Sequence, residues 1–325
     1  METSYIYSVS RVKALAKELL SDSDVDRLLT TSRGEEFVKA VKETYLVKFL
    51  EGEKNEDIFK ALDKSLFESK YLISSIAPQT SKFDWLWIRY DLHNLRIFVK
   101  AKKVGLSEET FKNSWSRLSK YEPETLLEHV NNNTLNRLEP ELVDIYEEAI
   151  KTAEEKGLAE ADFVIDRNYF RLAKRMITAT KDLTLDKILR LQIDVYNLKT
   201  RLRTLQINQS SDDWFVEGGN IGLAQIETKD QVVSMIGQFG NETKYREAFD
   251  VYNQVGHLTL IELALDEYFT DAVADLSHDI FSPASLVFYF WQCQNSAKRL
   301  QTILVGKENG QDNEFILKHL TKAYV

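Results

Sequence analysis

The residues that interrupt helices are scarce in this sequence. It contains four prolines and twelve glycines in 325 residues. β-Sandwiches and barrels need many tight turns, and tight turns favour these two residue types. We therefore expect an all-α fold of long helices, and a hydrophobic content of 43% is sufficient for a buried core.

The residues that bind metals or form disulfides are also few. The single cysteine, Cys293, excludes an internal disulfide and a zinc site built from several thiolates. A pair of histidines three or four positions apart, which could hold a metal on one helix face, is absent. The five histidines are His93, His129, His257, His278 and His319. We expect no metal and no cofactor, and we expect Cys293 to be a small buried side chain.

Long apolar runs are missing as well. No segment approaches eighteen uncharged apolar residues, which is about the length that a helix needs to cross a bilayer. Arg11 and Lys13 stand where a secretory signal would have its apolar region. The net charge of −9 disfavours nucleic acid as the main partner, because phosphate binding requires clustered basic residues. The sequence thus predicts a cytoplasmic protein without a transmembrane segment.

Two short motifs could suggest catalysis, but their surroundings do not support it. The glycine-rich stretch from Gly218 to Gly222 is not followed by Gly-Lys-Ser/Thr and no strand pattern precedes it, so a tight turn is the better interpretation. The pair Asp212-Asp213 is similar to the paired aspartates of all-helical prenyl-transfer enzymes. No third carboxylate follows it to bridge magnesium. We expect no catalytic residue and no small-molecule substrate.

One apolar helix pattern occurs three times along the chain. Counted from Asn94 and from Asn197, apolar residues occupy positions −9, −6, −2, +1 and +5, a spacing that forms one stripe of a helix. These residues are Trp85, Ile88, Leu92, Leu95 and Val99, then Ile188, Leu191, Val195, Leu198 and Leu202. A third copy, counted from Asn295, keeps Leu286, Tyr289, Cys293 and Leu300 and has Ser296 at +1.

Polar markers recur in phase with this stripe. Position −3 holds Asp91, Asp194 and Gln292, and position +11 holds Gly105, Asn208 and Gly306, where we expect the helices to end. A further aspartate lies 31, 31 and 29 residues before the three asparagines, at Asp63, Asp166 and Asp266; we call these the marker aspartates. Both signals recur at about one hundred residues, which predicts a tandem of three helical units.

The unit boundaries follow from this period. They are residues 1–106, 107–209 and 210–325. Within them we expect a helix from Ser107 to Leu118 and a short amphipathic helix over residues 312–324. No low-complexity linker separates the units, so we expect them to pack into one body.

The polar pairs at positions −3 and zero admit two interpretations. In the first, each pair forms a hydrogen-bonded clip between helices. In the second, the pairs and the cations near them line a shared concave surface that surrounds a central partner. The candidate partner-binding residues are then Asp91, Asn94, Arg96, Asp194, Asn197, Lys199, Arg201, Arg203 and Asn295.

Taken in order, these motifs resemble one known family over the whole chain. They are Asp-x-x-Asn-Leu-Arg/Lys at Asp91 and Asp194, Tyr5-x-Tyr7-x3-Arg11-Val12, Gly218-Gly219, Leu265-Asp266 before Phe281-Ser282, and Ile303-Leu304-Val305-Gly306-Lys307. The sequence is similar to the C subunit of the archaeal and bacterial V/A-type ATPase, whose eukaryotic counterpart is the d subunit of the vacuolar ATPase. It departs from the family at Gln292, Ser296 and Ala297, where an acidic, a hydrophobic and a basic residue are usual.

The resemblance implies a fold and a function. The fold would be an all-α funnel of three similar subdomains related by pseudo-threefold symmetry. The protein would be a peripheral subunit on the cytoplasmic face of the membrane, in contact with the proteolipid ring and with the central shaft subunits D and F, and without an active site. It would couple shaft and ring in a rotary motor that moves protons or sodium. A helical scaffold of another multisubunit assembly is the alternative, and an all-helical enzyme fits the sequence least.

Overall fold

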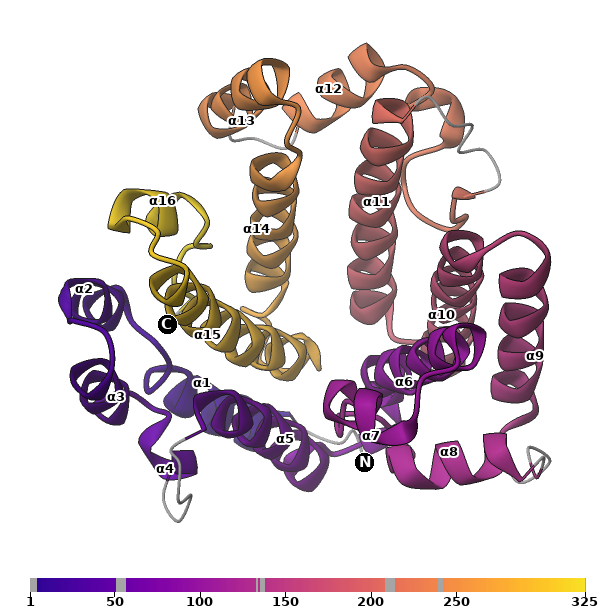
Figure 1. The fold of residues 1–325 in the computed structure, drawn as a ribbon, viewed down its shortest axis with the longest axis horizontal. Helices are drawn as coiled ribbons and strands as arrows, with labels where there is room; N and C mark the ends of the chain where they lie inside the picture. The colour runs from indigo at the N-terminus through magenta and orange to yellow at the C-terminus, as the bar shows by residue number, and fades with distance from the viewer. Residues whose placement is uncertain are drawn as a thin grey trace. The chain divides into compact units, whose positions relative to one another are not determined.

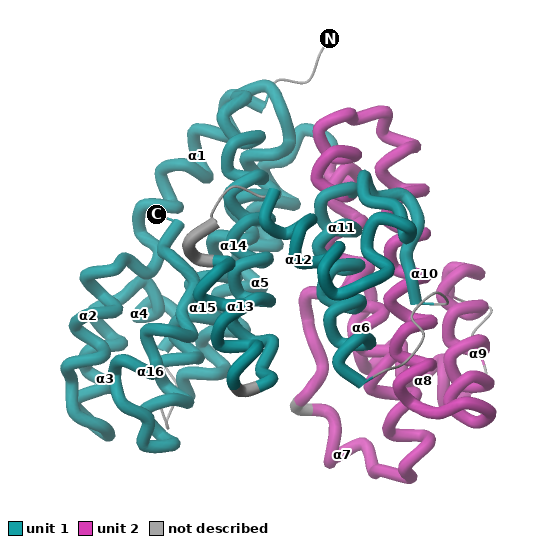
Figure 2. The backbone as a smooth tube through the Cα atoms, turned by 90° about the horizontal axis from the view of Figure 1, so that it is seen from above, with its two compact units in different colours: residues 1–79, 190–325 teal, residues 80–189 magenta. Residues whose placement is uncertain are grey.

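The chain folds into helices and loops. The computed structural model describes residues 5–50, 57–132, 134, 138–207, 214–238 and 242–324. These residues contain no β-strand (Figure 1), which confirms the predicted all-α fold class. The helices form two compact units (Figure 2). Unit 1 comprises residues 1–79 and 190–325, and unit 2 comprises residues 80–189.

The helices of each unit have the following bounds. Unit 2 contains α6 (Asp84–Val104), α7 (Glu108–Phe111), α8 (Pro123–Asn131), α9 (Pro140–Glu155) and α10 (Leu158–Thr180). The helix α11 (Leu183–Gln206) starts in unit 2 and continues in unit 1 from residue 190. Unit 1 also contains α1 (Ile6–Ala16), α2 (Asp22–Thr30), α3 (Glu35–Lys42), α4 (Val47–Leu50), α5 (Ile58–Ile76), α12 (Lys229–Gly237), α13 (Glu242–Val255), α14 (Thr259–Leu276), α15 (Ala284–Glu308) and α16 (Asn313–Lys318).

Unit 2 is built around α6, which packs against α9 and α10. The apolar stripe predicted for this helix is its buried face, since Trp85, Ile88, Leu92, Leu95 and Val99 are each at most 1% exposed. The rings of Phe98, Phe111 and Trp115 form a second contact layer, with centroids 5.9 to 6.0 Å apart. Burial of such large apolar side chains is the main stabilising term for the unit.

The long helix α15 lies at the centre of unit 1. It packs against α1, α5 and α14. Its stripe residues Leu286 and Leu300 are fully buried, and Cys293 is 6% exposed. The prediction that Cys293 is a small buried side chain is therefore confirmed.

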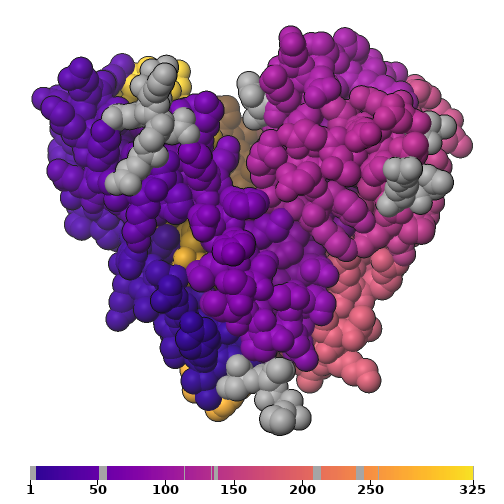
Figure 3. Space-filling view, turned by 90° about the horizontal axis from the view of Figure 1, so that it is seen from below, coloured from indigo at the N-terminus to yellow at the C-terminus, as the bar shows by residue number. Residues whose placement is uncertain are grey.

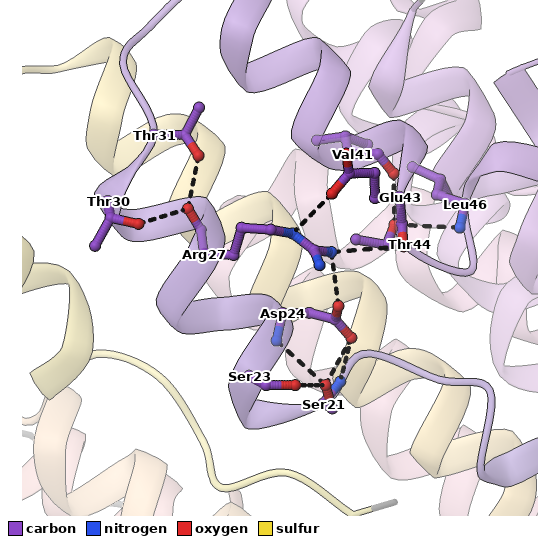
Figure 4. Close-up of polar contacts among 10 residues, drawn as sticks. All are labelled: Ser21, Ser23, Asp24, Arg27, Thr30, Thr31, Val41, Glu43, Thr44 and Leu46. Atoms are coloured by element: carbon purple, nitrogen blue, oxygen red, sulfur yellow. Dashed lines mark hydrogen bonds and ion pairs between the residues drawn. The ribbon is translucent and has the colours of Figure 1, made fainter.

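The N-terminal helices α2 to α4 share a hydrophobic core with the last turns of α15 and with α16. In the space-filling view, yellow atoms of the C-terminal region lie against the indigo N-terminal helices (Figure 3). The start of α2 is fixed by a capping box between Ser21 and Asp24. Arg27 then links Asp24, at 2.7 Å, to Glu43 beyond α3, at 3.4 Å (Figure 4).

Of the three helix ends predicted at position +11, one agrees with the structure and one does not. Gly105 ends α6 in the left-handed conformation with φ +72°, as expected. Asn208 lies outside the described residues. The prediction for Gly306 is wrong, because α15 continues to Glu308 and Gly306 lies inside it. Gly306 packs so closely on Ile316 that a β-carbon would meet its side chain at 2.7 Å, so close packing is the reason for a glycine here.

Two other helices are shorter than predicted. The helix expected from Ser107 to Leu118 ends at Phe111, apart from one 3₁₀ turn at Lys112–Ser114. The C-terminal helix covers only Asn313–Lys318, and residues 320–324 are irregular. In both places the irregular backbone is held by side chains of a distant helix. Those side chains belong to the polar pairs.

Candidate functional site

The first polar pair lies on α6 and is fully buried. Asp91 and Asn94 are each 0% exposed. The Asn94 amide pairs with the backbone of Ser116 in both directions: its Nδ2 donates to the carbonyl at 2.9 Å and its Oδ1 accepts from the N–H at 2.8 Å. The Asp91 carboxylate accepts the backbone N–H groups of Lys120 and Tyr121, each at 2.9 Å. Asn94 therefore satisfies two backbone groups of Ser116 that a helix over residues 112–118 would have used internally.

The second pair repeats this geometry on α11. The Asn197 amide pairs with both backbone groups of Val216, at 2.8 and 2.9 Å. The Asp194 carboxylate accepts the backbone N–H groups of Asn220 and Ile221, at 2.7 and 2.9 Å. Asp194 is 4% exposed and Asn197 is 2% exposed.

The two copies hold their backbone partners at the same spacing. The backbone bound by aspartate begins four residues after the residue bound by asparagine, at Lys120 after Ser116 and at Asn220 after Val216. We call these two arrangements the backbone clips. Clips between helices were one of the predicted interpretations. In the structure each clip joins a helix to the irregular segment that follows it, because a carboxylate or amide is best satisfied by backbone groups that lack helical partners.

The glycine-rich stretch from Gly218 to Gly222 belongs to the second clip. It forms a turn, as predicted, and Gly218 has φ +105°. The Asp194 carboxylate lies against Gly219 so closely that no β-carbon fits at position 219. Burial raises the pKa of Asp194, while the hydrogen bonds from Ile221 and Asn220 oppose that shift. The glycines therefore allow a buried carboxylate to reach the backbone.

The third copy holds the C-terminal segment instead. Asn295 donates to the carbonyl of Lys322 at 2.9 Å and accepts from the Thr321 hydroxyl. Gln292, which replaces the aspartate, donates to the carbonyl of Tyr324. The carboxylate that binds an N–H here comes from α14, where Glu267 accepts from Lys322 at 2.9 Å. An amide at position 292 fits a carbonyl partner, whereas a carboxylate would repel it.

The cations two residues after the first two asparagines pair with marker aspartates. Arg96 on α6 forms ion pairs with Asp166 and Asp162 of α10. Lys199 on α11 lies 2.5 Å from Asp266 of α14. Each cation therefore links an asparagine helix to the helix that carries the next marker aspartate along the chain. The equivalent residue of the third copy is Ala297, which is buried in the apolar core.

The two remaining candidate cations, Arg201 and Arg203, bind groups of unit 1 other than the marker aspartates. Arg201 donates to the carbonyls of Ile226, at 2.9 Å, and Glu227. Arg203 lies 2.6 Å from Glu262, and its side chain is 61% exposed. The pairs at Asp91, Asn94, Asp194 and Asn197 thus face the interior, and the arginines and Lys199 lie nearer the surface. Partner contact by any of the nine candidates stays a prediction.

Sequence reasoning did not single out two residues that matter for this arrangement. Glu267 supplies the carboxylate of the third copy, and Arg299 joins α15 to the start of α2. Arg299 is 4% exposed, donates to the carbonyl of Leu20 at 3.2 Å, and pairs with Asp22 at 2.5 Å. A charged residue on an apolar helix face was the available signal in both cases.

The described part of the chain contains no cluster of three or more histidine, cysteine, aspartate or glutamate side chains that could hold a metal. Among the same residues, no helix combines the length and apolar character required to cross a bilayer. The fold and the backbone clips define an all-α protein in which buried polar side chains of two long helices bind the protein's own backbone.

Comparison with known proteins gives the family. Residues 8–319 match the family described as ATP synthase (C/AC39) subunit. Similar proteins include the C subunit of the A-type ATP synthase of Pyrococcus abyssi, 24% identical over 97% of this chain and 89% of that protein. The C subunit of the A-type ATP synthase of Methanosarcina barkeri is 25% identical over 98% of this chain and 93% of that protein. The C subunit of the V-type ATP synthase of Deinococcus radiodurans is 23% identical over 69% of this chain and 67% of that protein.

The chain belongs to the ATP synthase (C/AC39) subunit family, because the match covers nearly all of it. This confirms the resemblance to the C subunit of V/A-type ATPases that the ordered motifs indicated.

Proposed function

We propose that this chain is a non-catalytic central-stalk subunit of a V/A-type rotary ATPase or ATP synthase. It acts as a socket that couples the shaft subunits D and F to the membrane proteolipid ring, for proton or sodium transport, as a peripheral subunit on the cytoplasmic face. The single observation that carries this proposal is the family match over residues 8–319, with relatives named as the C subunit of ATP synthases.

The order of helix contacts supports a socket made of three repeats. The asparagine helix α6 packs on the marker helix α10, and α11 is joined to α14 through Lys199 and Asp266. The third asparagine helix, α15, packs on the first marker helix, α5. In each case the asparagine helix of one predicted repeat contacts the marker helix of another. We propose pseudo-threefold subdomains at residues 1–106, 107–209 and 210–325.

The clips support a role in transmitting torque. An irregular segment that carries load must not shift against its helix, and buried hydrogen bonds to the backbone resist such a shift. Ser116 and Val216 are held by two hydrogen bonds each, and Val216 is also packed in the core, at 3% exposed. In this proposal the four buried pair residues Asp91, Asn94, Asp194 and Asn197 position the loops, and the cations contact the shaft.

Reconstitution with purified ring and shaft subunits tests the proposal. The chain should bind the proteolipid ring and the D–F shaft separately and join them in one complex. Arg203→Ala should weaken shaft binding about tenfold and leave ring binding unchanged, because this exposed cation would lose its contact with the shaft. Lys17→Ala is the matched control, since Lys17 is also an exposed cation of unit 1.

If the chain binds neither the ring nor the shaft, the socket role is wrong. The alternative, a helical-repeat scaffold of another assembly, would then be supported by its recovery in a complex without proteolipid. Equal loss of shaft binding in Arg203→Ala and Lys17→Ala would contradict the placement of the shaft surface.

A further inference from the structure

A pocket of ≈ 330 Å³ lies in unit 1, where the first turns of α3 and α5 meet the last turns of α15. Its lining includes the side chains of Phe37, Val38, Ile58 and Leu304 and the cations Arg33 and Lys307. None of these residues takes part in the backbone clips or in the ion pairs between repeats. The volume is at the lower end of the range for ligand pockets.

The floor of the pocket is apolar and well packed. Phe37, Ile58 and Leu304 are 4%, 6% and 9% exposed, so these side chains are fixed by the core beneath them. Phe59 also lines the pocket and is 41% exposed. Such a floor favours an apolar group about the size of one large side chain.

The two cations leave hydrogen-bond donors free beside this floor. Lys307 Nζ donates to the carbonyls of Leu29, at 2.9 Å, and Thr31, at 2.7 Å, which uses two of its three donors. Arg33 lies near enough for its charge to lower the pKa of Lys307, second to the effect of burial. Among the described residues neither cation has an ion-pair partner.

The carboxylates of the pocket do not neutralise these cations. Asp57 caps α5 by accepting the N–H of Lys60 at 3.2 Å, and its other oxygen lies 3.5 Å from the Lys60 ammonium. Glu308 is exposed and forms no ion pair within the described part of the chain. Two neighbouring cations beside an apolar floor repel each other, and a bound anion would relieve that repulsion.

We propose that this pocket binds a segment of a partner protein in which an apolar side chain stands next to a carboxylate. The apolar side chain fills the space over Phe37 and Leu304, and the carboxylate is held between Arg33 and the free donor of Lys307. A peptide fits better than a phospholipid because the pocket holds about one large side chain and has no room for two acyl chains. The inference does not depend on the proposed rotary function.

The test uses the full chain and two dipeptides, N-acetyl-Leu-Phe with a free carboxylate and the same dipeptide as its amide. Dissociation constants are measured by NMR titration of the ligand signals. The free acid should bind at least about tenfold more tightly than the amide, because only the acid presents a charge to the two cations. In Arg33→Gln the preference for the acid over the amide should fall at least about threefold, because Lys307 alone then faces the carboxylate. In Phe59→Ser both ligands should bind more weakly by a similar factor.

The control variant is Lys13→Gln, which removes an exposed cation of α1 in the same unit and should leave both constants unchanged. Circular dichroism and thermal unfolding of each variant should match the unsubstituted chain, since Arg33 and Phe59 contribute from the surface. Equal affinity for acid and amide, unchanged binding in Arg33→Gln, or no binding of the acid up to roughly 5 mM would each overturn the proposal. Arg33-dependent binding to phosphatidylglycerol vesicles in place of the dipeptide would also overturn it, by assigning the cations to a lipid surface.

Discussion

The carboxylate of Asp194 occupies the space where any residue other than glycine at position 219 would place its β-carbon. A buried acid on a helix and a glycine 25 positions later thus depend on each other. The carboxylate reaches the backbone N–H groups of Asn220 and Ile221 only because position 219 has no side chain. The same clip at Asp91 works without a glycine, since Leu118 and Ser119 occupy the positions of Gly218 and Gly219 in that loop.

Gly219→Ala should therefore destabilise the protein. The added methyl group displaces the Asp194 carboxylate from its buried hydrogen bonds, and we expect a loss of about 2 to 4 kcal/mol in the free energy of unfolding. Denaturation with urea measures it. Gly237→Ala is the control, because a β-carbon at Gly237 meets no atom within 4 Å and alanine is the better helix former. Equal stability of the two variants would contradict the close approach.

Asn197→Ala should uncouple residue 216 from α11. The substitution leaves the buried N–H and carbonyl of Val216 without partners, at a cost of about 2 to 4 kcal/mol. Hydrogen exchange provides the specific readout, since the Val216 amide should lose protection while amides in the middle of α15 keep it. Asn295→Ala is a matched comparison with a smaller expected cost, because Asn295 is only half buried. Unchanged exchange at Val216 would argue against the clip.

The ion pair between Lys199 and Asp266 should couple α11 to α14 by about 0.5 to 1 kcal/mol. The value is modest because the Asp266 side chain is 43% exposed and water screens the charges. A double-mutant cycle with Lys199→Ala and Asp266→Ala measures the coupling, and 1 M salt should reduce it. A cycle between Lys199 and Glu262 provides the negative control, since Glu262 pairs with Arg203. A coupling of zero at low salt would contradict this junction between α11 and α14.

The thiol of Cys293 should be unreactive in the native protein. Burial raises its pKa from 9.0 to about 12, and the thiolate is the reactive form. A disulfide reagent such as Ellman's reagent should modify it at pH 8 only after unfolding. Fast modification of the native chain would show that α15 opens locally.

The same shift makes stability depend on alkaline pH. The thiol ionises near pH 9 in the unfolded chain and stays protonated in the folded protein. The buried thiol therefore contributes fully to the free energy of unfolding below pH 9, and this contribution is lost as the pH rises towards 12. At pH 10.5 the loss should reach about 2 kcal/mol. The Cys293→Ala variant lacks the thiol. The difference between its pH profile and that of the unsubstituted chain separates the effect of the thiol from the titration of lysines and tyrosines. Parallel pH profiles of the two proteins would contradict the assignment.

Much of the fold could be predicted from local patterns. The stripe of α6 is buried as expected, and Gly105 ends that helix because its left-handed conformation suits glycine. The recurrence of Asp91 with Asn94 and of Asp194 with Asn197 also identified side chains with equivalent geometry. Their exact partners could not be predicted, because hydrogen bonds to a segment 19 or more residues away depend on how that segment folds back.

The two helix ends that were predicted wrongly also depend on contacts between segments far apart in the sequence. Residues 112–118 have a helical pattern, yet Asn94 offers the backbone of Ser116 alternative partners, so the helix stops early. Gly306 looks like a helix end, but contact with Ile316 requires a small residue inside the helix. In both cases a tertiary contact overrides the local preference.

The sequence by itself determined the helical class, the threefold recurrence and the family, because periodic burial and glycine conformation are local properties of the chain. The tertiary structure alone decided that the recurrent polar pairs bind backbone loops, that Arg96 and Lys199 pair with marker aspartates, and that Arg33 and Lys307 line the same pocket. Those outcomes depend on distances between segments far apart in sequence, which only the packing of the helices sets.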